Sequence, residues 1–151
     1  KFKEMKRVNQ LMLGLLILGV TTMTSCKKEG CTDPDSTTYN SEAKKDDGTC
    51  QYEGEAIFWY GATASNGLTA DGATNLTFYV DGEIVGSTAT SVFWTGSPDC
   101  GSNASITVTK DLSGVKTQSY SYSVIDQTGF EYYSGTLNFN ANTCFATELT
   151  W

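Results

Sequence analysis

The sequence predicts a mainly β protein, whose largest part, residues 53–151, forms an immunoglobulin-like antiparallel β-sandwich of about seven to eight strands. Three observations predict this class. This part of the chain shows no helical periodicity, its apolar residues alternate with polar ones over short stretches, and Gly, Asn and Asp separate those stretches at sandwich-like spacing. A domain of about 99 residues holds one hydrophobic core and is small enough to benefit from a disulfide.

A signal peptide is expected before this domain, in residues 1–25. The basic pair Lys6 and Arg7 precedes an apolar stretch, Leu11 to Val20, which is about ten residues long. A helix that spans a bilayer needs about twenty apolar residues, so the stretch is typical of a helical export signal rather than of a membrane span. Met5 stands directly before the basic pair, and we expect translation to begin there.

Cys26 follows this signal, where the apolar run ends in the smaller residues Thr24 and Ser25. The arrangement resembles the lipobox of bacterial lipoproteins, whose cysteine accepts lipid before cleavage frees its amino group. That resemblance implies a membrane anchor of acyl chains on Cys26, and two or three chains hold a protein far more firmly than one. The alternative is an ordinary secretory signal with a cysteine near its cleavage site.

Charge and composition exclude several kinds of function. Removing residues 1–25 takes away four basic residues and Glu4, which leaves six Lys against 16 acidic residues and a net charge of −10. Arg7, the only arginine, is lost with the signal, so the mature chain repels polyanions and we expect no nucleic-acid partner. Histidine is absent from the sequence, which removes Ser/His/Asp and Cys/His catalysis and histidine-bearing zinc sites.

A catalytic pair of carboxylates is the remaining enzymatic alternative. The β domain holds ten acidic residues, but most stand beside Gly or at strand ends, where turn chemistry explains them. A sandwich of this size also leaves little room for an enclosed cleft. We therefore expect a protein that is not an enzyme.

The cysteine count is odd until Cys26 is assigned to lipid. Cys31, Cys50, Cys100 and Cys144 then form an even set, as expected in an exported protein, and allow three pairings. We favour Cys31 with Cys50, which bracket a short polar segment, and Cys100 with Cys144, which both lie in the β domain. A zinc site is the weaker alternative, since the sequence contains no CxxC pair.

Residues 26–52 join the anchor to the β domain and contain an acidic module. Its start, Gly30-Cys31-Thr32-Asp33-Pro34, and its end, Asp46-Asp47-Gly48-Thr49-Cys50, resemble a small module that recurs in secreted and surface proteins of Bacteroidetes-type bacteria. The resemblance implies a disulfide-closed spacer that is sometimes suspected of binding calcium. Hard oxygen ligands of the kind that Ca²⁺ prefers are present in Asp33, Asp35, Asp46 and Asp47, although the segment is not an EF-hand. The alternative is that these acids cap turns in a solvated linker.

Eight segments of the β domain alternate or are rich in β-formers. They predict strands at Ala56 to Tyr60, Leu76 to Val80, Glu83 to Val85, Val92 to Thr95, Ser105 to Thr109, Gln118 to Val124, Gly135 to Phe139 and Cys144 to Trp151. Asp81-Gly82 supplies the positive-φ turn of the most secure hairpin. The residues expected to face the core are Leu76, Phe78, Val80, Ile106, Val108, Tyr120, Tyr122 and Val124.

Aromatic residues are denser than a core of this size needs, and adjacent ones on a strand point to opposite faces. Trp59, Tyr79 and Trp94 are therefore our candidates for exposed ligand-binding rings, which would stack on a sugar or dock a protein. The alternative is that these rings only cover the sheet faces, as Tyr and Trp commonly do in strands.

The β domain is similar to small β domains of Bacteroidetes-type lipoproteins, through the loop Ser97 to Gly101, the Tyr-rich strand Ser119 to Val124 and a terminal cysteine strand. These resemblances imply a lipoprotein of a bacterial outer membrane that faces the periplasm or the cell surface. We expect a non-enzymatic binding module, accessory to an outer-membrane or surface assembly through a protein partner. The alternative is a surface lipoprotein that binds polysaccharide, and a minor one is a structural envelope component. Coplanar exposed rings flanked by Asn, Asp or Glu would favour the sugar, whereas a mixed patch or an open strand edge would favour the protein.

Overall fold

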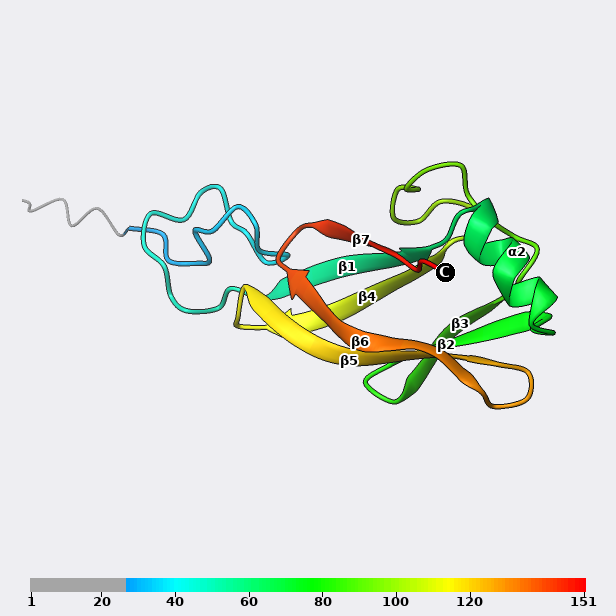
Figure 1. The fold of residues 1–151 in the computed structure, drawn as a ribbon. Coiled ribbons are helices and arrows are strands. Elements are labelled where there is room, and N and C mark those ends of the chain that lie inside the picture. Colours follow the sequence, from blue (N-terminus) through cyan, green and yellow to red (C-terminus); the bar gives the residue numbers. More distant parts are fainter. Residues whose placement is uncertain (1–26) are drawn as a thin grey trace, which may run out of the picture.

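The computed structural model describes residues 27–151, so the predicted signal peptide and Cys26 lie outside the described residues. Seven strands and one helix follow each other in this part of the chain (Figure 1). Their bounds are β1 (Tyr52–Trp59), α2 (Ala62–Ala70), β2 (Asn75–Val80), β3 (Glu83–Ala89), β4 (Ile106–Ser113), β5 (Thr117–Asp126), β6 (Glu131–Asn140) and β7 (Cys144–Glu148). They form a three-stranded sheet in the order β4-β1-β7 and a four-stranded sheet in the order β3-β2-β5-β6. The predicted fold class, mainly β with seven to eight strands in two sheets, is confirmed.

The core lies between the two sheets and follows the alternation of the strands. Leu76, Phe78 and Val80 of β2 are each at most 1% exposed, because every second residue of the strand faces the opposite sheet. Across the sheets, the ring of Phe78 lies 5.2 Å from that of Phe58 in β1. Burying such side chains fully stabilises a fold by roughly 1.5–3 kcal/mol each. The other predicted inward residues also belong to this core or pack against it, namely Val108, Val124, Ile106, Tyr120 and Tyr122.

Two hairpins build most of the four-stranded sheet. The first joins β2 to β3 through the predicted turn, in which Asp81 (φ 57°) and Gly82 (φ 77°) both have positive φ, as a type I′ turn requires. The second joins β5 to β6 through residues 127–130 and turns at Gly129 (φ 90°). Its register is interrupted between Val124 and Ile125, just before this turn.

Helix α2 differs from the expectation that residues 53–151 contain no helix. Its buried residues are Ala64, Ser65 and Leu68, Gly67 lies inside it, and no side-chain hydrogen bond caps its N-terminus. A helix this short, with a glycine and without a cap, gives almost no periodic signal in the sequence. Contacts with the rest of the fold hold it instead: the Ser65 hydroxyl donates a 2.7 Å hydrogen bond to the carbonyl oxygen of Thr90.

The predicted strand from Val92 to Thr95 is wrong, because these residues form a loop after β3. Val92 and Phe93 are exposed, and Trp94 N donates a 2.9 Å hydrogen bond to the carbonyl oxygen of Tyr60. Branched and aromatic side chains favour strands only where they also pack against neighbours on a sheet.

The last strand also differs in part from its prediction. β7 ends at Glu148 rather than at Trp151, and it runs parallel to β1, with Cys144 opposite Glu55. The sandwich is therefore not antiparallel throughout. Every other strand pair in residues 27–151 is antiparallel.

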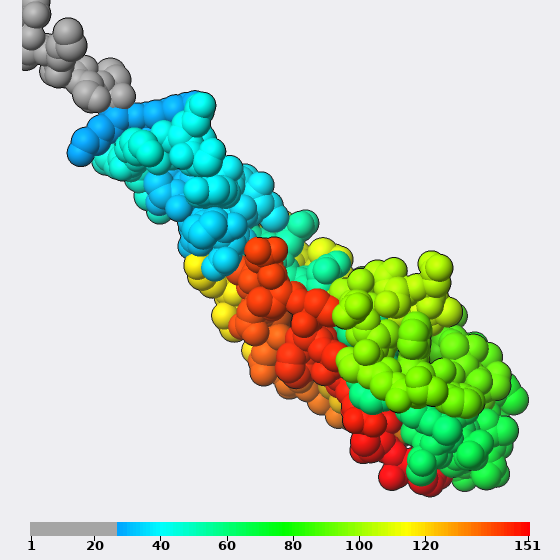
Figure 2. All heavy atoms as spheres, turned by 90° about the horizontal axis from the view of Figure 1, so that it is seen from above, coloured from blue at the N-terminus to red at the C-terminus, as the bar shows by residue number. Residues whose placement is uncertain are grey.

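The acidic module, residues 27–51, lies at one end of an elongated molecule, and α2 lies at the other end (Figures 1 and 2). The turn between β5 and β6 is at the same end as α2 (Figure 1). The module is built from turns, one isolated bridge between Glu29 and Lys45, and a disulfide. Neither it nor the described β domain includes a helix that is long and apolar enough to cross a membrane.

Candidate binding site

Three aromatic side chains are grouped at the end of the molecule that carries α2. Phe130 directly precedes β6, Tyr132 is the second residue of β6, and Trp151 follows β7. The ring centroid of Tyr132 lies 5.0 Å from that of Phe130 and 6.2 Å from that of Trp151. Phe130 is 60% exposed and Trp151 59% exposed, whereas Tyr132, which contacts both, is half-buried. We call these three residues the aromatic patch.

Gly67 of α2 sets the position of Trp151. A Cβ atom at Gly67 would lie only 2.3–2.6 Å from three atoms of the indole ring, so a face of the ring lies directly on the glycine. The Trp151 ring is inclined by 35° to that of Tyr132, while Phe130 stands at 74° to Tyr132. The aromatic patch therefore presents two rings of similar orientation and a third that is nearly edge-on.

A hollow of about 270 Å³, which we call the distal hollow, adjoins the aromatic patch. Its walls are formed by Asp71, Gly72, Asp126, Gln127, Thr128, Phe130 and Tyr132. The Tyr132 hydroxyl donates a 2.8 Å hydrogen bond to Asp71 Oδ2. This bond is the largest cause that raises the pKa of Tyr132 to about 12, because a tyrosinate would face a carboxylate.

Asp126 forms another wall of the distal hollow and holds the β5–β6 turn. Its Oδ1 accepts hydrogen bonds from Thr128 N at 2.8 Å, from Thr128 Oγ1 at 2.7 Å and from Phe130 N at 2.9 Å. These bonds, above all that from the Thr128 side chain, lower the pKa of Asp126 and keep it ionised. Gln127 ties the same turn to the segment between α2 and β2, since its Nε2 donates a 3.1 Å hydrogen bond to the carbonyl oxygen of Gly72. Phe130 is thus held at the rim by a fixed turn.

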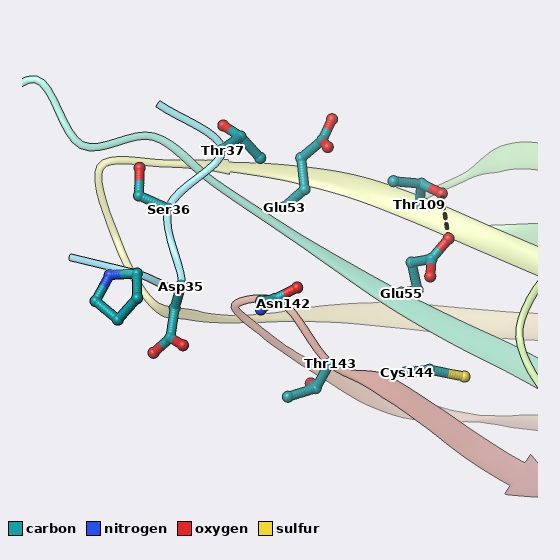
Figure 3. A pocket seen from close by; sticks show the side chains of 10 residues that line it. Asp35, Ser36, Thr37, Glu53, Glu55, Thr109, Asn142, Thr143 and Cys144 are labelled. Atoms are coloured by element: carbon teal, nitrogen blue, oxygen red, sulfur yellow. Dashed lines mark hydrogen bonds between the residues drawn. The ribbon is translucent and has the colours of Figure 1, made fainter. Parts of the chain in front are cut away.

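A larger hollow, of about 400 Å³, lies where the acidic module meets the β domain (Figure 3). Its lining combines module residues with residues from β1, β4, the turn between β6 and β7 and the first position of β7, namely Pro34, Asp35, Ser36, Thr37, Glu53, Glu55, Thr109, Asn142, Thr143 and Cys144. Glu55 and Thr109 are tied to each other, because the threonine hydroxyl donates a 3.3 Å hydrogen bond to Glu55 Oε1 (Figure 3). This lining has carboxylates and hydroxyls but no aromatic ring.

Lys116 joins the acidic module to the β domain. Its Nζ lies 2.6 Å from Asp33 Oδ2 and 2.9 Å from Asp35 Oδ2, and the Tyr52 hydroxyl donates a 2.9 Å hydrogen bond to Asp33 Oδ2. The bond from Lys116 is the main cause that lowers the pKa of Asp33, and the two acids together raise the pKa of Lys116. We call these four residues the Lys116 clasp.

The predicted calcium ligands do not meet at one point. Asp33 and Asp35 come together, but around the ammonium group of Lys116. Asp46 Oδ1 accepts a 2.9 Å hydrogen bond from Gly48 N, and Asp47 Oδ1 accepts a 3.0 Å bond from Thr49 N, so both acids cap turns. Within residues 27–151, no three acidic, histidine or cysteine side chains converge as metal ligands would. Calcium binding stays a prediction, and the geometry favours the turn-capping alternative.

The predicted ligand-binding rings lie on separate elements. Trp59 is on β1, Tyr79 on β2 and Trp94 in the loop after β3, and all three are half-buried. Of the close ring pairs in residues 27–151, none joins two of these three. Their role in binding stays a prediction, while the aromatic patch exposes more ring surface. The signal in the sequence that was missed is Phe130 itself, a large aromatic residue directly after the turn glycine Gly129.

Both favoured disulfides are formed. Cys31 is bonded to Cys50, which closes the acidic module, and Cys100 is bonded to Cys144. The second bond ties the loop before β4 to the first residue of β7. The pairing expected from the sequence is confirmed.

Compared with known proteins, the chain matches no family model, no curated protein and no solved structure.

Proposed function

We propose that this chain is a lipid-anchored, non-enzymatic binding protein of a bacterial envelope, which holds its ligand at the aromatic patch. One observation carries the proposal: the exposed rings of Phe130 and Trp151 are grouped around Tyr132 rather than scattered. Single exposed apolar residues are normal on a protein surface, but contiguous patches mark sites of interaction.

The position of the patch agrees with an anchor at Cys26. The acidic module, which follows Cys26 in the sequence, is at the opposite end of the molecule from α2 (Figures 1 and 2). Trp151 lies on Gly67 of α2, so the patch belongs to the far end. Acyl chains on Cys26 would then leave the patch directed away from the membrane.

The Lys116 clasp supports the same arrangement. A spacer without such contacts would let the β domain swing freely on its anchor, because a linker of polar and small residues behaves as a flexible chain. Here the ion pairs of Lys116 with Asp33 and Asp35 fix the module against the β domain. The module would therefore be a short rigid spacer that keeps the binding surface in a fixed position relative to the anchor.

Two separate experiments test the anchor and the binding surface. Cys26→Ala should move the protein from the membrane fraction into the soluble fraction, and unchanged partitioning would contradict the lipid anchor. For the surface, the chain is recovered from native membranes in mild detergent, and the molecules that co-purify are identified. Phe130→Ala with Trp151→Ala should remove them, whereas Phe145→Ala, an exposed phenylalanine of β7, should not. Equal recovery from both variants would contradict a role for the patch.

A further inference from the structure

We infer that the ligand of the aromatic patch is a neutral carbohydrate, with one sugar ring seated in the distal hollow against Tyr132 and the adjoining part of the ligand on Trp151, which contacts Tyr132 from outside the hollow. The inference rests on the proposed function, because it names the ligand class of that same site. The inference is based on three features around a small hollow: aromatic rings with exposed faces, carboxylate oxygens that accept no hydrogen bond from the described part of the chain, and negative charge.

The rings supply the apolar half of such a site. Trp151 lies with one face on Gly67, so the exposed part of its surface includes the opposite face. Tyr132 is inclined to it by only 35°, and Phe130 stands nearly edge-on at the rim of the hollow. A pyranose ring has faces made of C–H groups, which pack on aromatic faces, while its hydroxyls point outward to polar partners.

The carboxylates supply the polar half. Hydrogen bonds among the described residues use Oδ2 of Asp71 and Oδ1 of Asp126. Asp71 Oδ1 and Asp126 Oδ2 are left to accept from a ligand, and bonds to charged acceptors are stronger than those between neutral groups. Vicinal hydroxyls of a sugar are donors of the right kind, whereas an apolar ligand would offer no donor to Asp71 Oδ1 and Asp126 Oδ2.

Charge restricts the sugar to a neutral one. The two acids of the distal hollow carry negative charge, and residues 26–151 together have six Lys against 16 acidic residues. Uronic acids and sulfated sugars would bring like charge to these carboxylates and be repelled.

Size favours a sugar over a protein partner. An aromatic side chain buries about 150–250 Å² when fully covered, so three partly buried rings offer well under the roughly 800 Å² that a stable protein interface needs on each partner. The distal hollow, at about 270 Å³, lies near the lower limit of small-ligand sites, which begins at about 300 Å³.

An array of neutral and acidic oligosaccharides, probed with the full chain purified from membranes in detergent, tests the inference. We expect saturable binding to neutral glycans and none to uronic-acid or sulfated glycans. Phe130→Ala and Trp151→Ala should each weaken binding by about tenfold or more. Phe145→Ala, which removes an exposed ring outside the aromatic patch and the hollow, should leave binding unchanged.

Gly67→Ala keeps every ring and changes only where Trp151 can lie. Because the added Cβ would overlap the indole, the ring must move, and we expect a loss as large as that of Trp151→Ala. Alanine is a better helix former than glycine, so α2 should remain folded, which far-ultraviolet circular dichroism checks.

The inference is overturned if no neutral glycan binds, if acidic glycans bind equally well, or if Gly67→Ala and the patch variants bind like the unchanged chain. The proposed function can hold even when this inference fails. If a co-purifying protein depends on the patch while no glycan binds, the patch is a binding surface and its ligand is not carbohydrate.

Discussion

Lys116 of the β domain and Asp33 of the acidic module form a 2.6 Å ion pair across the boundary between the two parts. The same Nζ lies 5.7 Å from the centre of the Tyr52 ring, and the hydroxyl of that ring bonds to Asp33. Tyr52 is the first residue of β1, so the clasp acts where the chain passes from the module into the sandwich. The clasp therefore holds the module in addition to the covalent link and to the packing of Cys31 and Cys50 into the core.

Lys116→Met should loosen the module without unfolding the β domain, because it removes the charge and keeps much of the apolar stem. Hydrogen exchange should become faster at residues 33–37, where Asp35 N is held by Asp33 Oδ1 and Thr37 N by the carbonyl oxygen of Gln51. Amides of β2 and β5 should keep their protection. Lys110→Met is the matched control, since Lys110 lies over Tyr120 within the β domain. Equal exchange in both variants would show that the clasp does not hold the module.

The β domain should lose stability at acid pH partly through Asp126. The pKa of Asp126 is lowered in the folded protein, so the unfolded state binds more protons once the pH approaches the ordinary aspartate value of 3.8. Its stabilisation is complete above that value and is lost as the pH falls through the lower folded pKa. Melting temperatures measured from pH 7 to pH 2 should fall less steeply in Asp126→Asn below about pH 5. Asp99→Asn is the control, because Asp99 lies in an exposed loop, and its melting temperature should follow that of the unchanged chain. If the melting temperatures of both variants decline in parallel, the acid sensitivity comes from other groups.

Breaking the disulfide between Cys100 and Cys144 should destabilise the β domain more than breaking the one between Cys31 and Cys50. The first bond closes a loop of sequence separation 44 within the sandwich, and the second closes one of 19 in the module. Loss of a native disulfide from a small exported domain costs about 2–5 kcal/mol. Urea unfolding of the two double Cys→Ser variants, monitored by tryptophan fluorescence, measures the loss of stability in each. A larger shift for the module variant would show that Cys31 and Cys50, which pack into the same core, matter more to the β domain than the longer loop does.

Phe78→Ala should lower the free energy of unfolding by about 3–5 kcal/mol, because it opens a cavity between the sheets beside Phe58. Phe93→Ala is the control, since Phe93 is 47% exposed and its loss should cost less than about 0.5 kcal/mol. Chemical denaturation of both variants measures the two losses in free energy of unfolding, provided that the slope of this free energy against denaturant concentration is unchanged. A change at Phe93 as large as that at Phe78 would contradict the placement of the core.

The strands were predictable wherever burial on one face imposes alternation on the sequence. Leu76, Phe78 and Val80 illustrate this, and Asp81-Gly82 marks the turn after them because few residues other than Gly and Asn or Asp adopt positive φ. The disulfides were predictable for a different reason, since each favoured pair lies within one unit of the chain, the acidic module or the β domain.

Helix α2 and the aromatic patch were not predictable, because both depend on contacts between distant segments. Ser65 is held in α2 by Thr90, which is 25 residues away in the sequence. Trp151 contacts Gly67 and Tyr132, which belong to other elements of the fold. A local sequence pattern contains no information on such contacts, so the three rings predicted to be exposed, Trp59, Tyr79 and Trp94, are less exposed than Phe130 and Trp151.

The first strand of the β domain, β1, lies between β4 and the last strand, β7. One edge of β1 therefore stays unpaired until residues 144–148 are available, and Cys100 cannot form its bond until Cys144 arrives. A chain that lacks residues 144–148 would leave this edge of β1 open and Cys100 without its partner. Because β1 and β7 lie at opposite ends of the sequence of the β domain, completing this sheet requires nearly the whole domain to be present.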